Sequence, residues 1–207
     1  MSNYYMFNKP AGIVTARTDT THKTVMDYFK AEKNANLFPV GRLDKDTEGF
    51  LIITDDGQFN NKLMSPENHV EKKYLFFSLG KLSKKSVNTI SNGIILEGSS
   101  SKTLPSRFEN ISYINFGEVP EYAKCGIYNE ICNNLPDTPV TMGYLTITEG
   151  KKHQVKRMLK AYGCFVFYLK RISIGTIELD SSLSKGQYRR LTSSELDALI
   201  STHNLHQ

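Results

Sequence analysis

Short segments of regularly spaced apolar residues run through this chain and predict a mixture of strands and helices. Alternating or continuous apolar runs indicate strands, which we expect over residues 4–8, 50–54, 73–79, 144–148, 169–174 and 176–179, with one or two more within 94–114. Apolar residues at helical spacing indicate helices over residues 24–30, 58–64, 83–91, 153–162 and 196–200. Because there is no strict strand–helix–strand repeat, the pattern predicts an α+β fold with a mixed, largely antiparallel sheet and flanking helices.

Residues 115–141 interrupt this pattern with turn residues such as Asn, Gly and Pro. Such clusters are typical of loops, and we interpret this segment as a surface insertion between two strands. A chain of 207 residues can form one large domain or two small ones. Because we find no linker or internal repeat, we expect a single domain over residues 1–207.

Composition narrows the class of partner. The formal charge of +5 and the pI near 9.0 favour an acidic partner, and nucleic acid is the first candidate for a basic chain. The N-terminus has no basic segment followed by an apolar run, and no stretch is long and apolar enough for a membrane span. We therefore expect a soluble, cytoplasmic protein without a membrane partner.

Cysteine and histidine do not suggest a metal centre. The chain has three cysteines, Cys125, Cys132 and Cys164. Their odd number and the spacing of the first two do not match a disulfide framework or a zinc site. The five histidines are scattered along the sequence. The sequence therefore predicts ordinary reduced thiols and no bound metal.

The most informative stretch runs from Gly41 to Gly49 and places Asp44 directly before a predicted buried strand. A short polar loop supported by a stiff strand can hold one reactive group in a fixed position. Arg42 and Lys45 flank Asp44 and favour its ionised form. Such a carboxylate can act as nucleophile, base or metal ligand. Taken alone, the stretch is better explained as a solvated turn, because most charge clusters on loops have no chemical role.

A basic helix and one tyrosine add two further candidates. On the predicted helix 153–162 the apolar residues share one face, which leaves several cations on the other: Lys152, Lys156, Arg157 and Lys160. This face is either simply solvated or binds phosphates. Tyr74 begins a predicted apolar strand. It either packs in the core or offers a plane on which a base can stack.

In this order, these motifs resemble the RsuA-like branch of the pseudouridine synthases, which includes the RsuA, RluB, RluE and RluF enzymes that modify bacterial ribosomal RNA. The resemblance extends from Tyr5 to about Leu199. It rests on the segments Phe7–Gly12, Pro39–Asp44, Asp46–Leu51, Thr54–Gly57, Leu63–Pro66, Lys72–Tyr74, Glu149–Met158, Leu169–Gly175 and Gly186–Arg189.

The resemblance implies the pseudouridine synthase fold, with a central active-site cleft, and a role for each motif. Asp44 corresponds to the catalytic aspartate, Tyr74 to the tyrosine that stacks on the target base, and Lys156 to a cation that pairs with the aspartate. The reaction detaches uracil from C1′ at N1 and rejoins it through C5, so no cofactor and no metal is expected. Ribosomal RNA is the implied partner of a monomeric enzyme, and we expect its contacts from Arg42, Lys45, Lys72, Lys151, Lys152, His153, Gln154 and Arg157.

Three departures from the family pattern affect what is expected. The opening motif begins at residue 5, so the S4 RNA-binding domain usual in this branch has no counterpart. RluE-type members share this feature, which favours a uridine in large-subunit (23S) ribosomal RNA. Residues 115–141 match no part of the family pattern. Lys156 stands where Arg is frequent, which keeps the charge but loses the planar fork.

Two other functions compete with this interpretation. A metal-dependent nuclease could use Asp44, Asp46 and Glu48 to bind magnesium, although Arg42 and Lys45 place positive charge in the same loop. A non-catalytic RNA-binding module would need only the basic helix and would have no use for Asp44.

Overall fold

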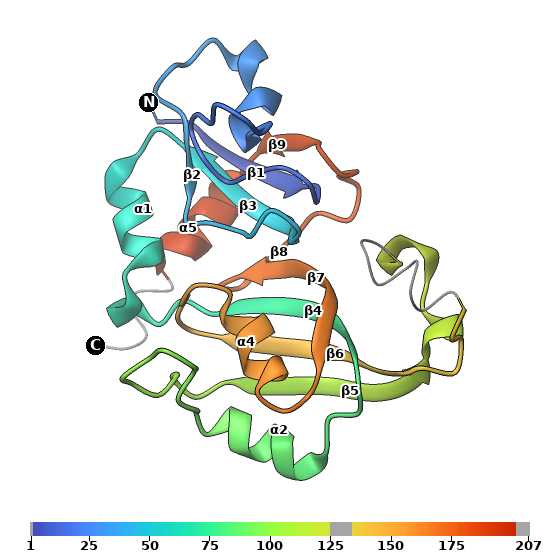
Figure 1. Cartoon of the computed structure of the whole chain (residues 1–207). Coiled ribbons are helices and arrows are strands. Elements are labelled where there is room, and N and C mark those ends of the chain that lie inside the picture. The colour runs from blue at the N-terminus through green and yellow to red at the C-terminus, as the bar shows by residue number, and fades with distance from the viewer. Residues whose placement is uncertain (1, 125–133, 202–207) are drawn as a thin grey trace. The chain divides into compact units, whose positions relative to one another are not determined.

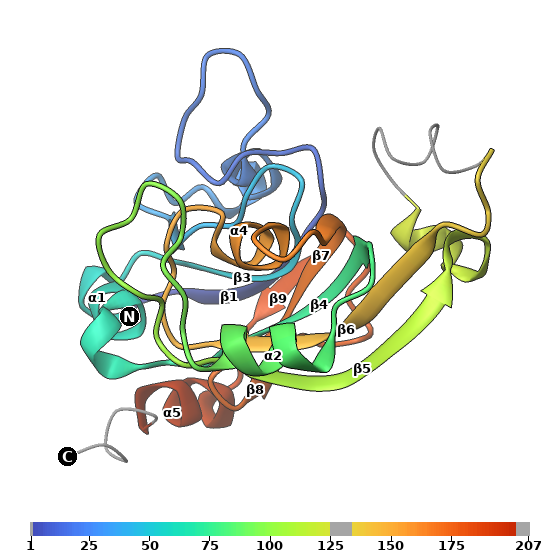
Figure 2. The same ribbon diagram turned by 60° about the horizontal axis from the view of Figure 1, so that its bottom comes forward.

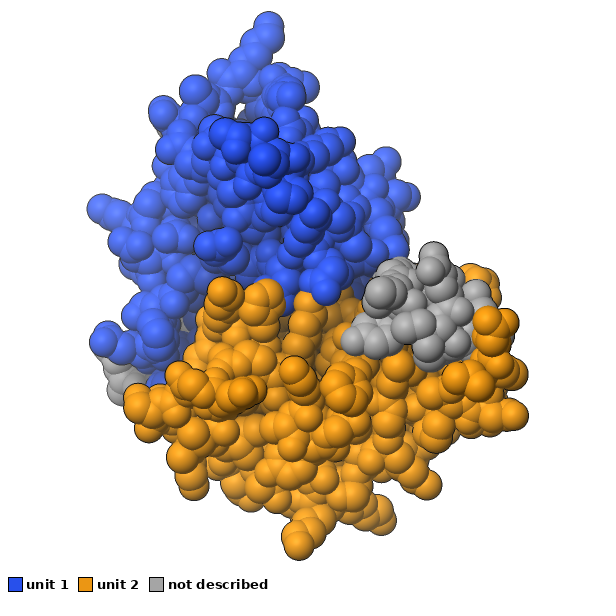
Figure 3. All heavy atoms as spheres, viewed as in Figure 1, with its two compact units in different colours: residues 1–72, 170–207 blue, residues 73–169 orange. Residues whose placement is uncertain are grey.

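The computed structural model describes residues 2–124 and 134–201, and these residues form two compact units (Figure 3). Unit 1 combines Met1–Lys72 with Lys170–Gln207, and unit 2 is the continuous segment Lys73–Leu169. Cys125 and Cys132 lie outside the described residues, whereas Cys164 is a buried free thiol. Within the described ranges, no helix is long and apolar enough to cross a bilayer.

Unit 1 is organised around one strand that is buried along its whole length, β3. This strand pairs antiparallel with β1 and β2 and parallel with β7, and β1 pairs in turn with β9. A strand covered on both faces needs a nearly continuous apolar sequence, as Phe50–Ile53 provides. The strands of unit 1 are β1 (Tyr4–Lys9), β2 (Phe38–Val40), β3 (Glu48–Thr54), β8 (Ile177–Glu178), β9 (Tyr188–Arg190) and the second half of β7 (Phe165–Ile174).

The two faces of these strands are covered by different elements (Figures 1 and 2). Side chains alternate between the faces of a strand, so Phe50 and Ile52 share a face. They pack against Phe59 of α1 (Gly57–Met64) and Leu199 of α5 (Ser193–Ser201). On the other face, aromatic rings of β1 and β9 meet Phe29. One side of unit 1 is therefore covered by the helices α1 and α5, and the other by aromatic rings around Phe29.

The segment expected to form a helix over residues 24–30 is instead two short 3-10 helices, Val25–Tyr28 and Lys30–Glu32. The first begins with a capping box between Thr24 and Asp27, which satisfies free N–H groups at the start of a helix. Further 3-10 turns are Pro66–Asn68, Phe116–Glu118 and Glu121–Ala123.

Unit 2 contains the strands β4, β5 and β6, in the order β5-β6-β4. One strand, β5, forms within residues 94–114, and the earlier part of that range contributes only an isolated bridge between Ile95 and Lys102. Helix α2 lies along β5. The elements are β4 (Lys72–Leu79), β5 (Arg107–Asn115), β6 (Pro139–Ile147), the first half of β7, α2 (Lys84–Ser91) and α4 (Gln154–Lys160).

The predicted surface insertion takes part in the core of unit 2. Phe116, Val119 and Ala123 are buried and pack with Phe77 and Val140. Because this segment connects the paired strands β5 and β6, its apolar side chains can fold back onto them. Residues 125–133 of the insertion lie outside the described part of the chain.

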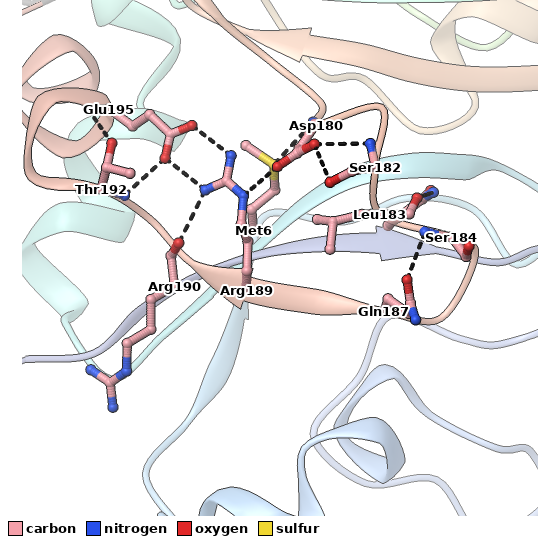
Figure 4. Close-up of polar contacts among 11 residues, drawn as sticks. Met6, Asp180, Ser182, Leu183, Ser184, Gln187, Arg189, Arg190, Thr192 and Glu195 are labelled. Atoms are coloured by element: carbon pink, nitrogen blue, oxygen red, sulfur yellow. Dashed lines mark hydrogen bonds and ion pairs between the residues drawn. The ribbon is translucent and has the colours of Figure 1, made fainter.

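An ion-pair network fastens the C-terminal helix of unit 1 to its last strand (Figure 4). The Arg189 guanidinium donates to both carboxylate oxygens of Glu195, at 2.8 Å each, and to Asp180 at 2.6 Å. Glu195 also accepts the backbone N–H of Thr192 and so caps α5. The hydrogen bonds from Arg189 are the main cause that lowers the pKa of Glu195 from 4.5 to about 2.

This network predicts a pH-dependent stability. A carboxylate with a depressed pKa stabilises the folded state above its unfolded pKa of 4.5, and this contribution is lost as pH falls through the folded pKa of about 2. We expect Glu195→Gln to lower the free energy of unfolding by about 1–2 kcal/mol at pH 7, allowing for solvent screening. Denaturant titrations should show this difference shrinking between pH 5 and pH 2. A difference that stays constant over that range would contradict the assignment.

Candidate active site

The Asp44 loop, residues 41–47, joins β2 to β3 in unit 1. It closes with a turn in which the Thr47 N–H donates to the Asp44 carbonyl at 3.1 Å. The Asp44 side chain is half-buried, whereas its neighbours Arg42, Lys45 and Asp46 are exposed. Asp44 is therefore partly enclosed, whereas the charged side chains next to it in the loop are open to solvent.

A fully buried lysine holds the backbone of this loop. Lys9 is 0% exposed, and its ammonium donates to the carbonyls of Asp44 at 3.1 Å, Lys45 at 3.3 Å and Thr47 at 2.8 Å, as well as to that of Pro10. A buried ammonium requires such acceptors. Lys9 thus fixes three of the seven loop residues through their main chain.

Threonine and glycine add further restraints on the loop. The Thr15 hydroxyl donates to the Leu43 carbonyl at 2.8 Å and accepts the Leu43 N–H at 3.2 Å. At Gly41, φ is +66°, a value that favours glycine. A β-carbon there would lie 2.3 Å from Met64 Sδ. The backbone on the N-terminal side of Asp44 is thereby held in one conformation.

Glu48 is paired with a lysine far away in sequence. It is 4% exposed and accepts from the Lys185 ammonium at 2.7 Å. Of the three acids considered for magnesium, Glu48 is thus held in an ion pair and Asp46 is exposed. Among residues 2–124 and 134–201, no three His, Cys, Asp or Glu side chains gather as metal ligands.

Two cations of unit 1, Lys72 in β4 and Arg171 in β7, are buried. Lys72 is 6% exposed and donates to the Val70 carbonyl at 2.9 Å. Burial, together with the nearby Arg171 guanidinium, lowers the pKa of Lys72 to about 8. Arg171 is 1% exposed and donates from Nε to the Phe50 carbonyl at 2.7 Å. The expectation that Lys72 contacts RNA at the surface is at odds with its burial.

Tyr74 lies near the start of β4, and the part of this strand that contains it belongs to unit 2. Only 8% of Tyr74 is exposed. It alternates with half-buried Lys73 and Leu75, as expected for a strand. A ring held so firmly needs little ordering on binding, but it presents only a small accessible area.

The start of α4 is organised by Gln154, which sequence reasoning had assigned to RNA contact. Gln154 is 4% exposed. Its amide donates to Glu149 at 2.7 Å, and its oxygen accepts the Lys151 N–H at 2.8 Å. Glu149 also accepts the Leu104 N–H at 2.9 Å. Gln154 therefore shapes the turn before α4, and its buried amide offers little surface to RNA.

The cations of this segment differ in how they are used. The Lys151 ammonium donates to the Lys102 carbonyl at 2.8 Å, and Arg157 donates to the Glu97 carbonyl. Lys151, just before α4, and Arg157, on α4, thus both bond the backbone of the loop over residues 97–102. Lys152 and His153 are exposed, and His153 adopts a left-handed conformation with φ of 51° at the start of the helix.

The structure supplies anchoring residues that sequence reasoning did not single out. Lys9, Thr15 and Lys185 all act on the Asp44 loop or the strand that follows it. One signal was present for Lys9, since it is a charge at the end of a buried strand. Asp44 belongs to unit 1, whereas Tyr74 and Lys156 belong to unit 2, so the pairing of Lys156 with Asp44 stays a prediction.

Comparisons with known proteins agree on one family. A family model described as RNA pseudouridylate synthase matches residues 3–161. The chain is 42% identical over 197 residues to an uncharacterized RNA pseudouridine synthase, YtzG of Bacillus subtilis, covering 95% of this chain and 72% of the relative. It is 36% identical over 198 residues to the ribosomal small subunit pseudouridine synthase A of Escherichia coli, covering 95% and 74%.

Comparison with solved structures supports the same family. A crystal structure of a pseudouridylate synthase superimposes with a TM-score of 0.77 at 35% identity, covering 96% of this chain and 74% of the other. The human RNA pseudouridylate synthase domain containing 1 shares the fold at 15% identity, with a TM-score of 0.55. The expected α+β fold with a mixed sheet and flanking helices is thereby confirmed.

Proposed function

Because this chain belongs to the RNA pseudouridylate synthase family and is an isomerase, we propose that it converts a uridine of ribosomal RNA to pseudouridine with Asp44 as the catalytic carboxylate. One observation carries the assignment to Asp44. The main chain around this half-buried side chain is held by Lys9 and Thr15, as a reacting group requires.

The chemistry suits a fixed carboxylate. The bond between N1 and C1′ must break, the uracil must turn, and C5 must bond to C1′ and release its proton. Asp44 can add covalently at the sugar or base, or stabilise the sugar and take up that proton. Tyr74 is proposed to support the extruded base, and Lys156 to pair with the Asp44 carboxylate.

The proposed RNA contacts divide according to exposure. Arg42, Lys45, Lys152 and His153 are exposed and suited to phosphates. Lys151 and Arg157 are committed to backbone carbonyls and would act mainly by keeping α4 in place. Lys72 and Gln154, being buried, are removed from the contact set.

The names of several relatives bear on the substrate. Relatives from Escherichia coli and Haemophilus influenzae are named ribosomal small subunit pseudouridine synthase A. These names support small-subunit ribosomal RNA as the first candidate, and large-subunit RNA, favoured by the sequence, is the second. We further propose that both units form one catalytic domain that acts as a monomer in the cytoplasm.

The test is direct. The purified chain is incubated with transcripts of small-subunit and large-subunit ribosomal RNA, and pseudouridines are mapped by carbodiimide labelling and primer extension. A single modified position in one transcript supports the proposal and identifies the subunit. If neither transcript is modified, either as naked RNA or as assembled subunits, the ribosomal assignment is wrong.

Two substitutions separate the proposed roles of Tyr74. Tyr74→Phe keeps the ring and should retain substantial RNA binding, whereas Tyr74→Ala should weaken it because base stacking is worth about 1–3 kcal/mol. Filter binding gives the affinity, and tritium release from C5-labelled RNA gives the turnover. Equal loss of turnover in both variants with binding intact would assign the role to the hydroxyl. Thermal unfolding serves as the control, since Tyr74 is buried.

A further inference from the structure

Unit 1 contains a pocket that the proposed reaction does not use. It has a volume of about 410 Å³, within the range of about 300–1,000 Å³ typical of ligand pockets. Its walls come from residues 17–18 and from residues between 26 and 37, around the two 3-10 helices. The pocket therefore lies entirely within one compact unit.

The floor of the pocket is apolar and rigid. Phe29 and Leu37 are 3% and 2% exposed, and Met26 is half-buried. The Phe29 ring stacks on Tyr188 with 4.2 Å between centroids and meets the edge of Tyr5. Because Phe29 is locked by other rings, the floor cannot collapse to fill the space. Phe29 and Leu37 support the floor from below, and half-buried Met26 supplies the apolar surface that a ligand can reach.

The rim of the pocket is cationic. Arg17, Lys30 and Lys33 line it, and no residue that lines it is acidic. Arg17 donates to the Ala35 carbonyl at 2.8 Å, which uses one of the five N–H donors of a guanidinium. Lys30 is paired with Asp27 at 2.7 Å and remains 78% exposed. An apolar floor with a positive rim suits a base that carries a phosphate.

The pocket is linked to the Asp44 loop through the chain itself. Arg17 comes two residues after Thr15, whose hydroxyl exchanges hydrogen bonds with the backbone of Leu43. Gly12, slightly earlier, donates to the Lys45 carbonyl at 2.8 Å. A nucleotide held by Arg17 would therefore be positioned relative to Asp44 by a short and hydrogen-bonded stretch of protein.

We propose that this pocket binds an unpaired nucleotide of the substrate RNA other than the target uridine, with its base against Met26 and its phosphate near Arg17 and Lys33. The inference rests on the proposed function, since it presumes an RNA substrate. The pocket would be a second site of RNA contact within unit 1. Only a single-stranded or splayed nucleotide fits, because a paired base cannot leave its stack to reach a pocket floor.

The test uses the full chain and a fluorescein-labelled single-stranded 12-nucleotide RNA of mixed sequence, followed by anisotropy over a range of salt. The double variant Arg17→Ala/Lys33→Ala should bind about tenfold more weakly and lower the slope of log K against log salt by about 1–2. A matched double variant, Lys62→Ala/Lys84→Ala, removes two exposed cations outside the pocket and should change affinity by less than about twofold. Equal losses in both double variants would overturn the proposal.

A single-site variant and a crosslinking experiment test the pocket independently of the double variant. Arg17 also bonds the backbone, so Lys33→Glu alone keeps that bond and should still weaken binding. RNA carrying 4-thiouridine should crosslink to residues 17–37, and crosslinks found only elsewhere would refute the pocket. A poly-glutamate peptide that binds more tightly than RNA, and depends on Arg17 and Lys33, would make the partner an acidic protein instead. If the wild type binds RNA here but forms no pseudouridine, the proposed function fails and the pocket stands.

Discussion

Replacing Asp44 by Asn should reduce pseudouridine formation to background while the protein stays folded and still binds RNA. Asn keeps the shape of the side chain but can neither attack a carbon nor take up a proton. The loss should be at least about 10²–10⁴-fold, the usual contribution of a positioned acid–base group. Tritium release from C5-labelled RNA measures it.

The matched control for this variant is Asp46→Asn, two residues further along the same loop. Asp46 is exposed, so its replacement should leave tritium release near the wild-type rate. If Asp44→Asn retains near-normal turnover, Asp44 is not the catalytic carboxylate. If Asp46→Asn is equally inactive, the loop needs its overall charge more than one particular carboxylate.

The proposed pairing of Lys156 with Asp44 predicts a loss of turnover when the cation is removed. A nearby opposite charge stabilises a carboxylate, so Lys156→Met should lower tritium release while RNA affinity changes little. A loss of RNA affinity with turnover unchanged would contradict the pairing.

Replacing Lys9, which holds the Asp44 loop from β1, by Met should strongly destabilise the protein. Met has similar length but no donor, so the carbonyls of Asp44, Lys45 and Thr47 lose the hydrogen bonds from Lys9. Buried acceptors left without a donor cost about 1–3 kcal/mol each. Because the substitution also removes the desolvation cost of a buried ammonium, we expect a net loss of about 2–4 kcal/mol. Because small proteins are stable by only about 5–15 kcal/mol, this is a large fraction.

Urea titration of Lys9→Met against the wild type measures this effect. Lys62→Met, an exposed position on α1, is the control for removing one positive charge and should stay within about 0.5 kcal/mol of the wild type. Turnover should also fall in Lys9→Met, because the Asp44 loop loosens. A free energy of unfolding equal to that of the wild type would show that Lys9 does not anchor the loop.

Elements with a strong local signal could be predicted from the sequence. The apolar run of β3 and the helix α1 with its Asp56 cap appear close to where they were expected. The short strands β2 and β9 were missed, because three residues carry too little pattern to distinguish a strand from a loop. These strands form because longer neighbours offer free backbone groups.

The candidate site shows the same division. Asp44 is proposed from its motif, but the sequence does not indicate the residues that hold its loop, because Lys9 and Thr15 reach it through hydrogen bonds between distant parts of the sequence. Lys72 shows a second limit of local sequence. A lysine beside a tyrosine suggests RNA contact, yet whether a strand residue points inward depends on tertiary packing that local sequence does not encode.

Unit 1 combines two segments that are separated in the sequence by the whole of unit 2. Its core therefore cannot be completed until unit 2 has been synthesised. Phe50 and Ile52 leave the exit tunnel before unit 2, whereas Ile174 and Leu199, which complete their cluster, are synthesised after it. Unit 2 is continuous and is finished first. Contacts so distant in sequence form slowly, and uncovered apolar strands are prone to aggregate. Until Ile174 and Leu199 are made, Phe50 and Ile52 lack part of the cluster that covers them, so slow translation of unit 2 would prolong their exposure.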